Sequence, residues 1–214
     1  MTNSRCIFRV PPRLQLVCEK AYAPQIVSIG PLHHHGKEAL KAMEEHKRRY
    51  LKYFLGRTNL SLMQYIEKIK NIREAKLRSC YLETIELKSD EFVKIILVDA
   101  IFVIHEFLFR YWHPKLLDES DCIFGEPMMT YDIWMDLLVL ENQLPFFILE
   151  DLFYLDIFPI SSEYSNRFDG VERLSIMFLS RCFLADSGII GGTIAKLETM
   201  CCSKEKVQNF VDLL

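Results

Sequence analysis

The chain has 214 residues, of which 50% are hydrophobic and 26% charged, with a mean hydropathy of +0.07 and a net charge of −3. This composition is typical of a globular protein that is long enough for one sizeable core or two small ones. The seven cysteines form no CxxC or CxxH pair, which excludes a recognisable zinc site or disulfide framework, and the N-terminus lacks the long apolar run of a secretory signal.

The charge is distributed unevenly along the chain. Residues 37–94 hold 14 Lys and Arg against 9 Asp and Glu, whereas residues 115–169 hold 2 against 12. We interpret these segments as two solvated faces of opposite sign that attract one another. The alternative is that the basic half meets an anionic partner such as a membrane surface or nucleic acid. Its basic residues alternate with glutamates and no aromatic stacking platform accompanies them, so nucleic acid is not expected.

Residues 1–36 show few helix signals. Cys6, Phe8 and Val10 alternate with polar residues until two prolines stop the run, and residues 22–30 are predicted to be extended up to Gly30. The triplet His33–His35 could suggest metal ligands. Adjacent side chains diverge, however, and no other Cys or His stands at a matching spacing, so no metal site is predicted.

Two amphipathic helices should follow. The first spans 37–54 and ends at Gly56, and the second is capped by Thr58 or Ser61 and runs to about Glu86. The residues expected inside the first helix are Leu40, Met43, Leu51, Phe54 and Leu55, and those expected outside are Glu44, Glu45, Lys47, Arg48 and Arg49. In the second helix the expected buried stripe is Leu62, Ile66, Ile69, Leu77 and Cys80.

A third helix should start at Ser89, whose side chain can cap it, and end before Pro114. It is apolar nearly all round, but its four charged or ionisable residues (Lys94, Asp99, His105 and Glu106) argue against a transmembrane span and favour a buried central helix. Asp99, Glu106, Arg110 and His113 share one face. We favour a buried ion-pair network for this stripe, and acid–base or metal chemistry by the two carboxylates is the alternative.

The segment DLLVLENQLPFF, residues 136–147, is the most distinctive in the chain. Leucines at helical spacing, Leu140 among them, predict that it is buried in a helix running from Thr130 or Asp132 to Phe153. Pro145 should kink that helix, and the amides of Asn142 and Gln143 should bond the backbone groups that the kink frees. A buried polar cluster of this kind must be hydrogen-bonded, which makes it an organising feature rather than an active site.

The remaining elements are a loop at 154–170, a helix from Asp169 to about Gly188 and a last amphipathic piece from Ser203. The expected fold is mainly α, an irregular helical bundle with short extended segments at the N-terminus. The sequence contains no GxGxxG, Walker, GxSxG or HExxH motif, so it names no reaction and no cofactor.

Four passages together resemble a plant protein family, domain of unknown function 247. They are IFRVPPRL at 7–14, YAPQIVSIGPLHHHG at 22–36 with the helix MEEHKRRYL, FVKIILVDAIFVIHE at 92–106 and LLVLENQLPFFILEDLF at 137–153. The resemblance covers roughly residues 5–155. It implies a mostly helical plant protein, attached to the membrane in its full-length form, with no established biochemical activity. Some grass members are implicated in pollen–stigma self-incompatibility, which implies recognition between proteins.

The chain departs from that family in its length and in one motif. Compared with the family pattern, we expect that a middle section and the C-terminal transmembrane anchor are missing from this sequence, and His105 stands where the family often has an apolar residue. We therefore predict one shortened domain over 1–214, with an extended segment at 1–36, a helical core at 37–155 and a remnant of the late region at 171–214. The resemblance implies the plasma membrane, whereas the chain alone is typical of a soluble intracellular protein.

Three hypotheses of function follow. The first is a non-enzymatic recognition or scaffold protein that binds a protein partner through its charged surfaces and His-rich loop. The second is a hydrolase or transferase in which Asp99, Glu106 and Glu141 converge in a pocket, and the third is a shortened copy without function. No residue is predicted to be catalytic, to bind a cofactor or to hold a metal. The candidates for structural residues of the family motifs are Asp99, Glu106, Arg110, Glu141, Asn142, Gln143 and Pro145.

Overall fold

The computed structural model describes residues 6–34, 40–56, 58–104 and 126–154, together with positions 123, 171, 175, 207–209 and 211. The fold is mainly helical, as predicted, and within these ranges the only β pairing is a parallel bridge between Ile7 and Tyr81. The elements are α1 (Pro12–Gln15), the 3₁₀ helix η1 (Glu19–Ala21), α2 (Lys41–Leu55), α3 (Leu62–Lys68), the π-helix η3 (Ile69–Arg73), α4 (Glu74–Cys80), α5 (Ser89–Ile101), α7 (Pro127–Leu137) and α8 (Phe146–Tyr154).

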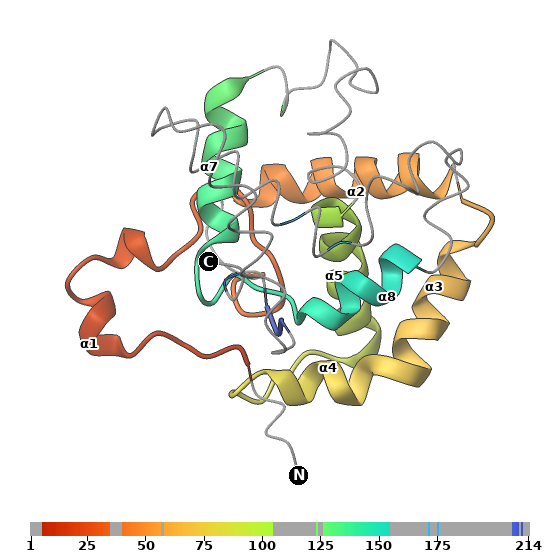
Figure 1. Cartoon of the computed structure of the whole chain (residues 1–214), viewed down its shortest axis with the longest axis horizontal. Coiled ribbons are helices and arrows are strands. Elements are labelled where there is room, and N and C mark those ends of the chain that lie inside the picture. Colours follow the sequence, from red (N-terminus) through yellow and green to blue (C-terminus); the bar gives the residue numbers. More distant parts are fainter. Residues whose placement is uncertain are drawn as a thin grey trace, which may run out of the picture.

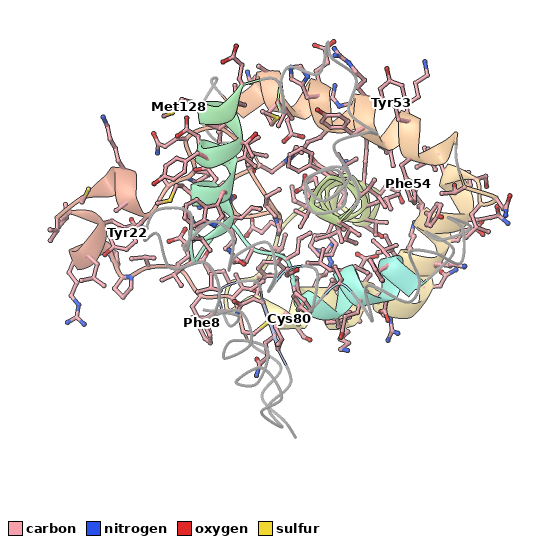
Figure 2. The ribbon with its side chains drawn as sticks, turned by 45° about the horizontal axis from the view of Figure 1, so that its top comes forward. Phe8, Tyr22, Tyr53, Phe54, Cys80 and Met128 are labelled. Carbon is pink, nitrogen blue, oxygen red and sulfur yellow. The ribbon has the colours of Figure 1, made fainter. Side chains whose placement is uncertain are left out.

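Helix α5 is the centre of the fold. It contacts α2, α3, η3 and α8, and in Figure 2 it is seen nearly end-on between α2, α3 and α8. Its residues from Phe92 onward are buried on every side except at Lys94, which confirms the prediction of a buried central helix. Within the described part of the chain, no helix has both the length and the apolar character needed to cross a bilayer.

Helix α2 packs against α5 as its apolar stripe predicts, with one exception. Lys47 was expected to face solvent, but its side chain is completely buried. The reason is its register: Lys47 lies four residues after Met43 and four before Leu51, so it belongs to the face that meets α5. The burial requires partners for its ammonium group, and these lie in the site described below.

The second predicted helix is divided into three pieces. Ser61 caps α3 through a capping box with Gln64, as its sequence suggests. A π-helical stretch, η3, then shifts the register before α4, which ends at Cys80 and not near Glu86. Leu62 is therefore exposed although it was expected inside, whereas Tyr65 is buried.

The segment 136–147 does not form one kinked helix. Helix α7 begins at Pro127, earlier than Thr130 or Asp132, and ends at Leu137, and α8 begins after Pro145. A proline directly before a helix costs no hydrogen bond, because the first N–H groups of a helix have no partner within it. The intervening turn exposes 49% of Leu140, which was expected to be buried.

Three contacts connect segments that are opposite in charge or distant in the sequence. Arg73 of η3 forms an ion pair with Asp151 of α8 (2.6 Å), consistent with attraction between the basic and acidic segments. Late in the chain, the carbonyl of Gln208 accepts a hydrogen bond from the Phe146 amide (2.7 Å), and the Asn209 side chain donates to the Cys6 carbonyl (3.1 Å). The predicted loop after 154 and the helix from Asp169 lie outside the described residues, apart from single positions.

Candidate functional site

Five buried polar side chains lie together where α5, the end of α7 and the turn before α8 meet the N-terminal segment. We call this set the polar anchor. It brings together residues of two motifs that lie about 40 residues apart in the sequence. Its members are Asp99, Asp136, Glu141, Asn142 and Gln143, none of which exposes more than 2% of its surface.

Asp136, on the last turn of α7, binds three consecutive backbone N–H groups. Its carboxylate accepts hydrogen bonds from Gln25 (2.8 Å), Ile26 (2.6 Å) and Val27 (2.8 Å). Burial raises the pKa of Asp136, while the same three N–H donors act in the opposite direction. The carboxylate thus provides the acceptor for three successive N–H groups at a bend of the chain around Gln25 and Ile26, where the backbone is not paired with a strand.

Asn142 continues this pairing along the same segment. Its Oδ1 atom accepts a hydrogen bond from the Ile29 amide (2.6 Å), and its Nδ2 atom donates to the carbonyl oxygens of Val27 (3.0 Å) and Asp136 (2.9 Å). One side chain therefore satisfies two backbone groups of the N-terminal segment and one carbonyl at the end of α7. An amide suits this task because it offers both donors and acceptors.

Gln143 closes the end of α7. Its Nε2 atom donates to the carbonyl of Leu137 (2.6 Å), which has no partner within a helix that stops here. It also donates to the carbonyl of Val139 in the following turn (2.9 Å), which accepts the Asn142 amide as well (2.9 Å). These bonds and those of Asn142 agree with the expectation that the two amides satisfy freed backbone groups. The Gln143 carbonyl accepts a hydrogen bond from the hydroxyl of Tyr81 (3.1 Å), whose pKa burial raises well above its ordinary value.

Gly30 is the point of closest approach between the two segments. It has a φ of +76°, and a Cβ atom added to it would lie 2.5 Å from the Gln143 carbonyl oxygen. Any side chain here would be strained both by its backbone conformation and by that contact. Glycine at this position therefore lets the N-terminal segment approach the polar anchor this closely without strain.

Asp99 and Lys47 hold the end of the segment from the side of α5 and α2. The Gly30 amide donates to Asp99 (2.8 Å), and the Lys47 ammonium group donates to Asp99 and to the carbonyl of Ser28 (2.7 Å). Lys47 also forms an ion pair with Glu44 of its own helix. Burial raises the pKa of Asp99 to about 6, while the nearby positive charge of Lys47 acts to lower it.

Glu141 anchors the first part of the N-terminal segment. Its carboxylate accepts hydrogen bonds from the Val10 amide (2.7 Å), the Gln15 side chain (3.0 Å) and the Arg9 guanidinium group (2.9 Å). His33 Nε2 lies 3.5 Å from the same carboxylate. Arg9 also pairs with the exposed Glu83 (2.7 Å), whose hydrogen bond raises the pKa of Arg9.

Together these contacts give the polar anchor a clear chemical character. The three carboxylates, Asp99, Asp136 and Glu141, all accept hydrogen bonds from donors within the chain. These donors are backbone N–H groups and the side chains of Lys47, Arg9 and Gln15. A small pocket beside Asn142 and Gln143 has a volume of about 10 Å³, which is room for about one water molecule. Among the residues that the structure describes, no group of His, Cys, Asp and Glu has the arrangement of a metal site.

The structure thus brings together four of the residues singled out from the sequence: Asp99, Glu141, Asn142 and Gln143. Pro145 lies directly after them, and His33 lies beside Glu141. Glu106, Arg110 and His113, which should continue the stripe from Asp99, lie outside the described residues, so the predicted network stays a prediction. His105 also lies outside them.

Sequence reasoning missed three residues of this site. Lys47 carried a signal, because it falls within the apolar stripe of its helix. The sequence indicates only that an extended run ends at Gly30. The need for glycine there comes from its positive φ and from its close approach to the carbonyl of Gln143, which lies 113 residues later in the sequence. The role of Asp136 left no local signal, because its partners Gln25 and Val27 lie about 110 residues earlier.

The fold and the site define a mainly helical protein in which one polar motif fixes an extended N-terminal segment. The chain belongs to the family described as plant protein of unknown function, DUF247, whose family model matches residues 7–214. This confirms the family resemblance carried by the four sequence passages.

Two relatives from Arabidopsis thaliana are similar to this chain. The UPF0481 protein At3g47200 is 35% identical over 166 residues, which are 77% of this chain and 34% of that protein. The putative UPF0481 protein At3g02645 is 31% identical over 144 residues, which are 67% of this chain and 26% of that protein. The chain thus spans about a third of the first and about a quarter of the second. No solved structure matches the chain significantly.

Proposed function

We propose that this chain is a non-enzymatic recognition or scaffold module, in which the polar anchor holds the N-terminal segment so that part of it can contact another protein. The observation that carries the proposal is the set of hydrogen bonds that the three buried carboxylates, Asp99, Asp136 and Glu141, accept. Each accepts hydrogen bonds from at least two donors of the chain itself. A catalytic carboxylate must reach the proton or atom on which it acts, and these three are closed off from any ligand.

The contact surface that this anchoring presents is residues 11–24, which we call the N-terminal arm. It starts after Val10, which Glu141 binds, and ends before Gln25, which Asp136 binds. In Figure 1 the arm, with α1, extends to one side of the helical body. Its tip exposes 87% of Leu16 and 83% of Val17, the two highest values among the large apolar side chains described.

The partner that fits this arm is a protein with an apolar recess bordered by acidic groups. Leu14, Leu16 and Val17 provide adjacent apolar side chains, and the exposed Arg13 and Lys20 flank them. Grouped apolar side chains between two cations match such a recess in both shape and charge. The family resemblance to membrane-attached and self-incompatibility proteins favours a partner at a plant membrane.

The test compares one double variant and one single variant with the unchanged chain. Each chain is used for affinity capture from solubilised plant plasma membranes, and the captured proteins are measured by quantitative mass spectrometry. Leu16→Ser with Val17→Ser should lower the recovery of a specific partner at least about tenfold, the effect of losing about 1.4 kcal/mol of binding free energy. Met128→Ser is the matched control, since Met128 of α7 is 68% exposed and lies away from the arm (Figure 2). Equal recovery with all three chains would contradict the proposed contact surface.

A second test asks whether Glu141 holds the arm or performs chemistry. Glu141→Gln replaces one carboxylate oxygen by an NH₂ group that cannot accept the hydrogen bond of Arg9 or Val10. Trypsin should then cut faster after Arg13 and Lys20, while the rest of the chain resists. Glu83→Gln is the control, because it removes only the exposed ion pair, worth about 0–1 kcal/mol. Unchanged cleavage of the arm in Glu141→Gln would refute the anchoring role.

The alternative hydrolase or transferase hypothesis needs Asp99, Glu106 and Glu141 in an open cavity, and two of these three are enclosed by internal donors. The hypothesis of a shortened copy without function predicts a chain that cannot bury its apolar faces. Circular dichroism during heating, together with size-exclusion chromatography, separates it from our proposal. One sharp transition and one defined peak support a folded module, whereas a broad transition with aggregation supports the shortened copy.

A further inference from the structure

Two cysteines lie next to each other where the N-terminal segment begins. The parallel bridge between Ile7 and Tyr81 makes Cys6 and Cys80 the preceding pair in the same register. The Cys6 amide donates to the Cys80 carbonyl (2.9 Å), and the Leu82 amide donates to the Ile7 carbonyl (3.0 Å). The Ile7 amide donates to the same Cys80 carbonyl (3.1 Å), so the backbone at Cys6 lies directly against the end of α4, and a disulfide requires such a close approach of the two residues.

The two side chains also lie close to each other. Cys80 is the last residue of α4, and the thiols of Cys6 and Cys80 are within hydrogen-bonding reach of each other. The Cys6 thiol also approaches the Gln208 carbonyl (3.8 Å), and the Cys80 thiol donates to the carbonyl of Lys76 (3.3 Å). Both cysteines are reduced in the structure. A disulfide therefore needs only a small adjustment of side chains.

Their surroundings give the two thiols different roles. Cys6 is partly exposed, so a reagent can reach it, whereas Cys80 is buried and can meet only its neighbour. The neighbouring Cys6 thiol lowers the pKa of the Cys80 thiol, and the charge of Lys76 acts in the same direction, against the effect of burial. A lowered pKa increases the fraction of thiolate, the form that attacks a disulfide.

We propose that Cys6 and Cys80 form a redox-active dithiol, which a low-molecular-weight disulfide such as glutathione disulfide converts into an intramolecular disulfide. The Cys6 thiolate attacks one sulfur of glutathione disulfide and releases the first glutathione. The Cys80 thiolate then attacks the Cys6 sulfur of this mixed disulfide and releases the second. The pair loses two electrons and two protons, and glutathione disulfide becomes two glutathione molecules.

The disulfide would fasten the start of the N-terminal segment covalently to the end of α4. It would also remove the thiol hydrogen that Cys6 directs at the Gln208 carbonyl. Oxidation would thus strengthen the contact between Cys6 and α4 and weaken the contact between Cys6 and Gln208. In contrast, Cys18 lies exposed on the arm, outside this backbone pairing. Glutathione disulfide should leave Cys18 as a mixed disulfide, and this difference makes Cys18 an internal control.

The test is disulfide mapping of the unchanged chain after incubation with glutathione disulfide. Trypsin without reduction should release peptide 6–9 linked to peptide 79–88, while peptide 14–20 carries glutathione on Cys18. The linked peptide should disappear after dithiothreitol, and the oxidised chain should unfold at a higher urea concentration than the reduced chain. Persistent glutathione on Cys6, or links spread over other cysteines, would overturn the proposal.

Two variants keep the test independent of folding defects. Cys80→Ala should trap glutathione on Cys6, because the second attack is lost, and Cys6→Ser should leave Cys80 unmodified, because a buried thiol cannot meet the reagent. Circular dichroism establishes that each variant is folded. If Cys80 in a folded Cys6→Ser chain reacted as fast as Cys18, the order of the two steps would be wrong.

Discussion

Asn142 is the residue at which the anchoring role can be tested most sharply. In Asn142→Ala, the amide of Ile29 loses its acceptor, and the carbonyls of Val27 and Asp136 lose their donor, all within the core. A buried group left without a partner costs about 1–3 kcal/mol. Three such groups, with some relief from water entering the neighbouring pocket, should reduce the free energy of unfolding by about 3–6 kcal/mol.

A loss of that size is a large part of the 5–15 kcal/mol that is typical of a folded domain. Urea unfolding followed by far-ultraviolet circular dichroism measures it as a lower midpoint. Leu140→Ala provides the control, since Leu140 lies in the same turn with a half-exposed side chain and should change stability by no more than about 0.5 kcal/mol.

Asn142→Asp refines the test. The carboxylate still accepts the hydrogen bond of the Ile29 amide, but it presents an oxygen to the carbonyls of Val27 and Asp136, where the amide presented a donor. This variant should therefore be strongly destabilised at neutral pH and partly recover at lower pH, where a protonated carboxyl can donate once. A loss below about 1 kcal/mol in Asn142→Ala, no larger than in the Leu140 control, would refute the anchoring role.

Further predictions concern the neighbouring residues. Gly30→Ala should cost about 1–3 kcal/mol in a thermal melt because its Cβ meets the Gln143 carbonyl at 2.5 Å, whereas Gly56→Ala, where that atom has ordinary contacts, should be near neutral. Lys47→Met should lower stability by about 3–5 kcal/mol, because it leaves the buried Asp99 charge unpaired. Burial raises the pKa of Asp99 to about 6, so between about pH 4 and pH 6 the native state binds a proton that the unfolded chain releases. The stability of the unchanged chain relative to Asp99→Asn should therefore fall by about 3 kcal/mol as the pH rises from about 4 to about 6. A difference in urea unfolding that stays flat or rises with pH would contradict this assignment.

Local patterns predicted the elements whose structure depends on neighbouring residues. The cap at Ser61 and the continuous apolar run of α5 are of this kind, and both agree with the structure. Pro145 shows where a local pattern is ambiguous. The leucine spacing around it fits a kinked helix as well as two helices, and the choice depends on whether the carbonyls at the end of α7 find partners in Asn142 and Gln143.

The polar anchor could be predicted only in part, because its partners are distant in sequence. Asn142 and Gln143 stood out, since polar residues in an apolar run require hydrogen bonds wherever they lie. These bonds reach Val27 and Ile29 because the N-terminal segment crosses the core beside them. The path of that segment is not encoded by the hydrophobic period of a helix (3.6 residues) or of a strand (2 residues). Lys47 was misjudged for a related reason: residue type was given more weight than its position on the helix face.

An extended segment inside a helical protein poses a specific physical problem. Its backbone N–H and C=O groups are buried beside helices, whose own backbone groups are already paired, so side chains must take the place of a neighbouring strand. Here Asp136, Asn142, Asp99 and Lys47 do so in sequence along residues 25–30. Buried carboxylates and amides gathered around one motif are also the pattern expected of an active site, and what separates the two cases is the identity of their partners. Because the partners here belong to the chain itself, as backbone groups and as the side chains of Arg9, Gln15 and Lys47, the polar motif explains how the N-terminal segment is held. The proposed contacts with another protein are therefore tested on the arm.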